Sequence, residues 1–408
     1  MSHRNKLKIL NDPIYGFITI PDALIFDLIE HPYFQRLRRI TQLGLTYLVY
    51  PGAYHTRFHH ALGAMHLMGK AVRILRSKGH LITEEEEQAV NIAILLHDIG
   101  HGPFSHALEN SIVPGIKHEK LSLEFMKALN QEFDGRLELA IQIFTNQYPK
   151  KFLHQLISSQ LDMDRLDYLR RDCFYTGVSE GQVNSERLIT MLNVADDQLV
   201  VDSKGIYSVE KFIVARRLMY WQVYLHKTVL SAEFLLIKIL SRARAVYNEQ
   251  MIIPSVLKRF IRENLPAEYS SLLPYYAQLD DYDIMSAIKE WQHHDDPVLS
   301  MLCKSLLKRK LLGAYISNTL PDHTLVQNIR ECVASRYGIR HEDTAFLVFN
   351  EALTNNAYDP QRHRINLLYR DGSLQDIALA ADQLNISALA QPVTKHFLFY
   401  PKECWPKG

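Results

Sequence analysis

Hydrophobic side chains recur every three or four positions along much of this chain, which predicts a protein built mainly from helices. The clearest case is residues 57–78, where Thr56 stands at the N-cap position and Gly79 follows the last turn. One face of this predicted helix carries a continuous apolar stripe: Phe58, Ala61, Leu62, Met65, Met68, Val72 and Leu75. Such a stripe predicts that the helix packs against a core.

A second helix is predicted over residues 84–96, because Thr83 and Glu86 have the spacing of a capping box. Its last turns are apolar on nearly every side, which predicts that this end is buried. The helix leads directly into His97 and Asp98. An imidazole and a carboxylate at a buried helix end need a compensating partner, and a metal ion would supply one.

The rest of the chain divides by its pattern. Residues 209–248 have the periodicity of one very long helix, and a short helix and a hairpin precede it, with the hairpin turn predicted at Gly205. Beyond about residue 320, alternating strand-like runs replace the helical pattern. We therefore predict three regions: a helical core at 1–250, a helical extension at 251–319 and a small α+β appendage at 320–408.

Composition narrows the class of protein. The 408 residues carry 46 Lys and Arg against 45 Asp and Glu, and this balance provides no general attraction for nucleic acid. The N-terminus lacks the apolar centre of a signal peptide, and no apolar run is long enough to span a bilayer. The four cysteines form no close pair, which argues against a disulfide framework. We expect a cytoplasmic protein without a membrane or nucleic-acid partner.

The densest chemistry lies in residues 93–106, AILLHDIGHGPFSH, where three histidines and an aspartate fall within ten positions: His97, Asp98, His101 and His106. Imidazole and carboxylate are the usual ligands of divalent first-row metals. A single histidine would be explained more simply as a helix cap or as a donor to a buried carbonyl. An adjacent His-Asp pair at a buried helix end, with two more histidines behind it, favours a functional site.

Charges alternate in sign along residues 162–172, where four aspartates are interspersed with arginines. On its own, this pattern is typical of a solvent-exposed helix stabilised by ion pairs. However, Asp164 and Tyr168 share one helical face beside Leu161. That face could reach a metal in the core.

His60, His97-Asp98 and Asp164 together have the order H…HD…D, the signature of the HD metal-dependent phosphohydrolases. The strings HTRFHHALGAMHL, LLHDIGHGPFSH, KHEKLS and LDMDRLDYLRRDCFYTG closely resemble the deoxynucleoside triphosphate (dNTP) triphosphohydrolases. This group includes the sterile-alpha-motif HD-domain enzyme of animals and its bacterial relatives. The strings NDPIYGFITI, FQRLRRITQLG and YWQVYLHK resemble it too, and the resemblance covers roughly residues 6–250. It implies an HD-domain helical core with a smaller C-terminal α+β region.

The resemblance implies roles for matching residues. The implied ligands of a divalent ion (Mn, Fe, Ni, Co, Zn or Mg) are His60, His97, Asp98 and Asp164. The implied residues around the triphosphate are Arg57, His101, His106 and His118, with His106 as proton donor to the leaving 5′ oxygen. The implied nucleotide clamp is Tyr168, Arg216, Tyr224 and Lys227, with Gln42 and Leu43 against the sugar and base.

Some positions depart from the pattern of these relatives. Glu109 stands three residues after His106, where the relatives have an aspartate, and its longer arm could move His106. Three residues match the allosteric nucleotide pocket of the relatives in type: Glu30, Gln35 and Arg38. Activation by a nucleotide is therefore a hypothesis, which predicts sigmoidal or lagging dNTP kinetics relieved by GTP or dGTP.

These observations favour a metal-dependent enzyme that converts a dNTP to a deoxynucleoside and triphosphate, working as a homo-oligomer (dimer or tetramer) as its relatives do. Two alternatives stay open. One is an HD phosphohydrolase acting on another nucleotide phosphoester, which would release orthophosphate instead of triphosphate. The other is a non-catalytic HD protein that binds or senses nucleotides and leaves them intact.

Overall fold

The structure, a computed structural model, describes residues 8–113, 115–262, 271–360, 364–381, 386 and 391–406. The chain is mainly helical and carries small sheets, as the sequence predicts. Within the described ranges, no helix combines the length and apolar character needed to cross a membrane.

Elements up to residue 205 form most of the helical core. They are β1 (Ile9–Asp12), β2 (Gly16–Thr19), α1 (Ala23–Glu30), α2 (Pro32–Gln35), η1 (Arg36–Arg39), η2 (Gly44–Leu48), α3 (Arg57–Ser77), α4 (Glu84–Leu96), α5 (Ser105–Ile112), α6 (His118–Glu132), α7 (Glu138–Phe144), α8 (Lys151–Gln155), α9 (Met163–Thr176), η3 (Ser179–Gly181), α10 (Ser185–Met191), β3 (Leu192–Ala195), β4 (Gln198–Asp202) and η4 (Ser203–Gly205).

The remaining elements complete the core and add the C-terminal sheets. They are α11 (Ile206–Met219), η5 (Tyr220–Tyr224), α12 (Lys227–Ala245), α13 (Ser255–Ile261), α14 (Leu273–Tyr276), α15 (Asp281–Trp291), α16 (Pro297–Leu307), β5 (Gly313–Ser317), α17 (His323–Tyr337), η7 (His341–Phe346), β6 (Phe349–Asn355), β7 (Asn366–Leu368), β8 (Leu374–Asp376), α18 (Ile377–Ala380), β9 (Val393–Tyr400) and η8 (Lys402–Cys404).

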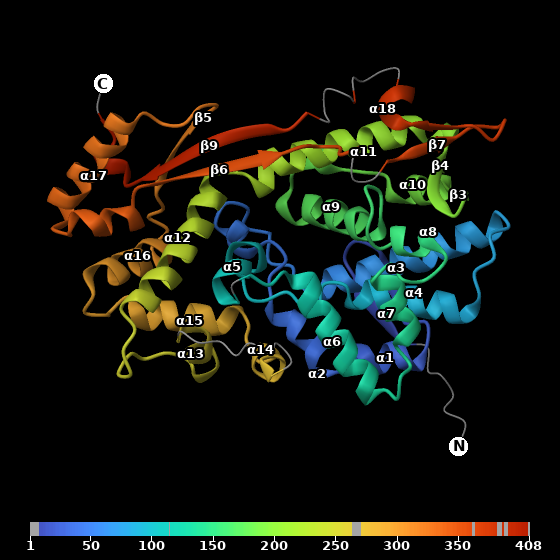
Figure 1. Cartoon of the computed structure of the whole chain (residues 1–408), viewed down its shortest axis with the longest axis horizontal. Coiled ribbons are helices and arrows are strands. Elements are labelled where there is room, and N and C mark those ends of the chain that lie inside the picture. Colours follow the sequence, from blue (N-terminus) through green and yellow to red (C-terminus); the bar gives the residue numbers. More distant parts are fainter. Residues whose placement is uncertain are drawn as a thin grey trace.

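Helix α3 lies at the centre of the core and packs against both α4 and α9 (Figure 1). Side-chain caps fix where each of these helices begins. Thr56 caps α3, Thr83 and Glu86 form a reciprocal capping box at α4, and Asp162 accepts a hydrogen bond from the Arg165 amide at α9. The caps matter for function because the site residues lie within a turn of a helix end.

Gly63 allows α3 and α9 to approach closely. A Cβ atom at this position would lie 2.0 Å from Oδ1 of Asp167 and 2.2 Å from Nη2 of Arg171. We expect Gly63→Ala to lower the free energy of unfolding by about 2 kcal/mol or more, because the buried ion pair must move. Urea unfolding would measure the change.

Gly69 in the same helix is the matched control. A Cβ there would meet nothing closer than 3.6 Å, and alanine is favoured over glycine in a helix by about 1 kcal/mol. Gly69→Ala should therefore be neutral or stabilising. Equal effects at the two positions would contradict the close-approach explanation.

The single helix predicted over residues 209–248 is interrupted. Helix α11 ends in a π-helical turn, Tyr220–Tyr224, and α12 begins after His226, whose side chain accepts a hydrogen bond from the Thr228 amide. His226 has extended backbone dihedrals and acts as the cap of a new helix, so the apolar periodicity continues across two separate helices.

The predicted hairpin exists, but its turn lies earlier in the chain. Strands β3 and β4 pair antiparallel around Asp196 and Asp197, both of which have positive φ angles. Aspartate tolerates this conformation better than most residues, so no glycine is needed there. Gly205 instead ends the short turn η4 before α11.

The strand-rich C-terminal residues contribute to two sheets. Strand β9 lies between β5 and β6 in an antiparallel sheet, toward the end of the molecule that carries α17 (Figure 1). Strands β7 and β8 extend the β3–β4 hairpin, and Val201 of β4 pairs in parallel register with Leu367 of β7. The C-terminal residues are thus joined to the helical core by strand pairing.

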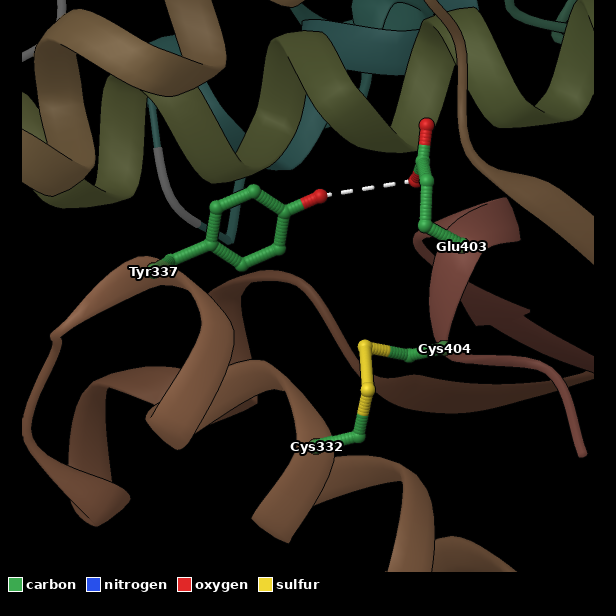
Figure 2. The surroundings of a disulfide bond; sticks show 4 residues. All are labelled: Cys332, Tyr337, Glu403 and Cys404. Atoms are coloured by element: carbon green, nitrogen blue, oxygen red, sulfur yellow. Dashed lines mark hydrogen bonds between the residues drawn. A yellow bond between two sulfur atoms is a disulfide. The ribbon is translucent and has the colours of Figure 1, made fainter.

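The scattered cysteines argued against a disulfide framework, but one pair is bonded. Cys332 of α17 is bonded to Cys404 of η8, as Figure 2 shows, beside a hydrogen bond from Tyr337 to Glu403. The two cysteines are 72 residues apart in the chain, and only the packing of the C-terminal turn against α17 brings them together. Cys173 and Cys303 are free thiols.

Candidate active site

Four side chains from three helix ends converge in the core. His60 comes from the first turn of α3, His97 and Asp98 follow α4, and Asp164 lies in the first turn of α9. Oδ1 of Asp164 is 3.1 Å from Nε2 of His60 and 3.5 Å from Nε2 of His97. Oδ1 of Asp98 is 3.3 Å from Nε2 of His97. Two imidazole nitrogens therefore face two carboxylates across a small space.

The hydrogen bonds behind the two histidines fit a bound metal ion. Nδ1 of His60 contacts Oδ2 of Asp167 at 2.8 Å, and Nδ1 of His97 contacts the carbonyl oxygen of Ile94 at 2.6 Å. Because both partners only accept hydrogen bonds, we infer that each proton sits on Nδ1 and each Nε2 presents a lone pair. Both Nε2 atoms are buried and have no hydrogen-bond partner in the described part of the chain. A divalent cation would satisfy them.

The acid-base state of the cluster supports the same interpretation. Burial alone lowers the pKa of His60, but the carboxylates of Asp164 and Asp167 outweigh burial and raise this pKa to about 10. Burial raises the pKa of Asp98, but His97 and other nearby positive charges hold it well below its ordinary value. Positive charge is therefore required here, and a metal ion would replace protons as its source.

Helix α9 supports the cluster from behind through a buried ionic chain. Four of its charged residues are almost completely buried: Asp162, Asp167, Arg171 and Asp172. Arg171 donates to Asp167 through Nε at 2.9 Å and to Asp12 through Nη1 at 2.8 Å. The prediction of an exposed ion-paired helix is wrong for these residues, because their charges pair inside the core.

Two further histidines stack beside the cluster. The rings of His101 and His118 lie 3.8 Å apart and nearly parallel, and Nε2 of His101 is 3.4 Å from Oδ1 of Asp98. Glu109 contacts Nδ1 of His118 at 2.6 Å and accepts a hydrogen bond from its backbone amide. In the structure, Glu109 therefore orients His118. The side chain of His106 lies outside the described residues, and its predicted role as proton donor stays a prediction.

A cavity of about 430 Å³ opens from this cluster. Its walls include nine of the predicted site residues: Gln42, Leu43, Arg57, Asp98, His101, His118, Asp164, Tyr168 and Tyr224. Arg57 is buried and donates to Oδ2 of Asp98 at 2.6 Å, and the Tyr224 hydroxyl donates to Asp172 at 2.8 Å. The lining of the cavity therefore combines acidic and imidazole groups with an arginine and aromatic rings.

Other predicted residues do not line this cavity. Arg216 donates to Gln160 at 2.9 Å, and Lys227 is exposed at the first turn of α12. Arg38 donates to Gln35 at 2.8 Å away from the cavity, and Glu30 is exposed at the end of α1. A role for these residues in nucleotide binding or activation stays a prediction.

The structure adds cavity residues that the sequence patterns did not single out, among them Arg165, Tyr220 and Glu233. Arg165 follows Asp164 directly, and this adjacency was an available signal. Burial is the largest influence on the pKa of Arg165 and lowers it, but the nearby acidic charges outweigh it and raise the pKa above the ordinary arginine value. Glu233 gave no such signal, because it lies within an apolar helical pattern.

Asp281 positions two walls of the cavity from a distant part of the chain. Its carboxylate accepts hydrogen bonds from the amide and hydroxyl of Thr41, at 2.9 Å and 2.7 Å, and from the amide of Phe104 at 2.9 Å. Thr41 precedes Gln42, and Phe104 is itself a cavity residue with a left-handed backbone. No spacing in the sequence links Asp281 to these segments.

Comparisons with known proteins agree with this fold. The HD domain family matches residues 57–172, and the HD-associated region matches residues 183–250. The uncharacterized protein YwfO of Bacillus subtilis is 32% identical to this chain, and the alignment spans 97% of this chain and 92% of YwfO. A crystal structure of a phosphohydrolase from Bacteroides thetaiotaomicron is 48% identical, with a TM-score of 0.93 over 96% of this chain and 99% of that one.

A helical core with a histidine-aspartate cluster of this kind is the mark of a class of metal-dependent phosphohydrolases. Within that class, the chain belongs to the HD-domain family, and it is an HD-type phosphohydrolase. The deoxynucleoside triphosphate triphosphohydrolase SAMHD1 homolog of Dictyostelium discoideum is 36% identical over 58% of this chain. The chain spans about half the length of that relative (49%).

Proposed function

We propose that this protein is a metal-dependent dNTP triphosphohydrolase, which releases a deoxynucleoside and triphosphate. The observation that carries the proposal is a single cavity. Its lining includes Asp98 and Asp164 of the histidine-aspartate cluster, two arginines and three tyrosines. Phosphate oxygens are recognised by arginine, and a nucleoside packs well against aromatic rings. The resemblance to dNTP triphosphohydrolases supports the same substrate class.

A divalent ion held by His60, His97, Asp98 and Asp164 would supply Lewis-acid polarisation and lower the pKa of a water. The chain's own residues bind and orient the substrate. Arg57 and Arg165 face the cavity and would balance the negative charge of the triphosphate. His101 and His118 stack on each other in the lining of the same cavity, where an imidazole can bind a phosphate oxygen or carry a proton.

The test is a product assay with purified protein, Mn²⁺ and each dNTP, with GTP withheld or added. We expect deoxynucleoside and triphosphate in equal amounts, and dependence on GTP would support the activator hypothesis. Orthophosphate as the only phosphate product would overturn the proposal in favour of another phosphoester. Nucleotide that binds but stays intact with every candidate metal would point to a sensor. Sedimentation of the active protein would test the proposed homo-oligomer.

Glu109 gives a further prediction about this site. We expect Glu109→Gln to lower kcat about tenfold, because an amide oxygen accepts these hydrogen bonds more weakly than a carboxylate and holds His118 less firmly.

Glu119→Gln is the control for Glu109, because Glu119 is exposed and lies 3.7 Å from the same Nδ1 of His118. It should change kcat less than about twofold, as screening by solvent weakens exposed pairs. A kcat of Glu109→Gln equal to that of the wild type would contradict the orienting role.

A further inference from the structure

Glu233 places a carboxyl group in the wall of the cavity. It lies in the second turn of α12, and Oε1 would be 3.7 Å from a Cβ atom built at Gly44 in η2. In the described part of the chain, no side chain forms a hydrogen bond or ion pair with it. Burial raises the pKa of this carboxyl to about 8.

Apolar side chains line part of the cavity together with Glu233. Leu43, Leu230 and Phe104 line the same cavity and are each less than one tenth exposed. Glu233 itself is only partly exposed, and a carboxyl group that faces an apolar wall without a donor from the described residues is free to accept hydrogen bonds from a bound molecule. A molecule that fills the cavity could supply those donors.

Charge determines which part of the substrate lies there. The triphosphate would be held where Arg57, Arg165 and the histidines face the cavity. A carboxylate repels phosphate oxygens, so the wall formed by α12 and η2 suits the uncharged part of a nucleotide. Flat apolar faces and N–H groups at the edge are the features of a nucleobase.

We propose that Glu233 recognises the nucleobase by accepting hydrogen bonds from two adjacent N–H groups, the pair presented by guanine. This inference rests on the proposed dNTP hydrolysis. An ionised carboxylate has two acceptor oxygens and no donor, so it matches the N1–H and the N2 amino group of guanine together. Adenine and cytosine present an amino group beside a ring acceptor, and thymine presents one N–H between two carbonyl oxygens. The active site should therefore prefer dGTP.

The experiment compares dGTP with dITP, which lacks only the N2 amino group. Assays at pH 8.5 with Mn²⁺ keep a large share of the carboxyl ionised. The wild type should have a kcat/KM about tenfold or more higher for dGTP than for dITP, since a site built to bind an N–H rejects an analogue without it. In Glu233→Gln and Glu233→Leu, that ratio should fall to near one, while kcat/KM for dTTP changes less than about threefold.

Glu290→Gln, which makes the same chemical change at an exposed position of α15, should leave the dGTP to dITP ratio as in the wild type. An unchanged ratio in both Glu233 variants would overturn the inference. So would an equal loss on all four dNTPs, which would indicate a structural role or a contact to the sugar. If the wild type released no triphosphate from any dNTP, the proposed function itself would fail, and this outcome is separate from a changed ratio.

Discussion

An Asp164→Ala variant is expected to lose its bound metal and its hydrolytic activity while keeping its fold. Oδ1 of Asp164 is within 3.5 Å of Nε2 in both His60 and His97, so its loss opens the centre of the cluster. We expect kcat to fall by more than about a hundredfold, because removal of an outer-shell partner alone typically costs 10- to 100-fold. Metal content per chain, measured by mass spectrometry, should drop with it.

A thermal measurement gives a second test of the same change. A ligand at 100 times its Kd stabilises the folded state by about 2.7 kcal/mol, so Mn²⁺ should raise the Tm of the wild type but not of Asp164→Ala. Asp27→Ala is the control, because Asp27 is an exposed residue of α1. If Asp164→Ala kept its metal and its Mn²⁺ response, the ligand assignment would be wrong.

An Arg171→Met variant should lose about 3–5 kcal/mol of unfolding free energy, the cost of breaking a buried ion pair. Arg171 is completely buried and is the shared cation of Asp167 and Asp12. Methionine fills similar space but leaves both carboxylates without their partner. Because Asp167 also holds Nδ1 of His60, metal affinity should weaken about 10- to 100-fold. Urea unfolding and a metal titration would measure the two effects.

Arg170→Met is the matched control in the neighbouring position. Arg170 is only partly buried, and its hydrogen bonds to Ser185 and the Ile14 carbonyl are 3.2 Å and 3.4 Å long. It should cost less than about 1 kcal/mol, as polar contacts near the surface usually do. A similar small cost for Arg171→Met would show that the buried chain contributes little to stability.

Local rules predicted the elements that carry the metal-type residues. Caps and periodicity located α3 and α4, because Thr56, Thr83 and Glu86 satisfy backbone amides within their own helices. They also predicted that His97 and Asp98 follow a buried helix end. Local rules failed where the deciding contact is not local. Apolar periodicity continued across the break at His226, and charge alternation suggested exposure for Arg171, whose partner Asp12 is 159 residues away in the chain.

The sequence by itself determined the helical character of the core, the helix ends of the cluster and the residue types that a divalent metal prefers, and its motifs resembled the HD family. The helix ends follow from interactions within one or two turns of the same helix. The tertiary structure alone decided that Asp167 and Arg171 support His60, that Glu109 holds His118, and that Cys332 meets Cys404. It also brought Asp281 and Glu233 to the cavity. Contacts between residues far apart in the chain depend on how whole helices pack, and no local pattern in the sequence encodes that packing.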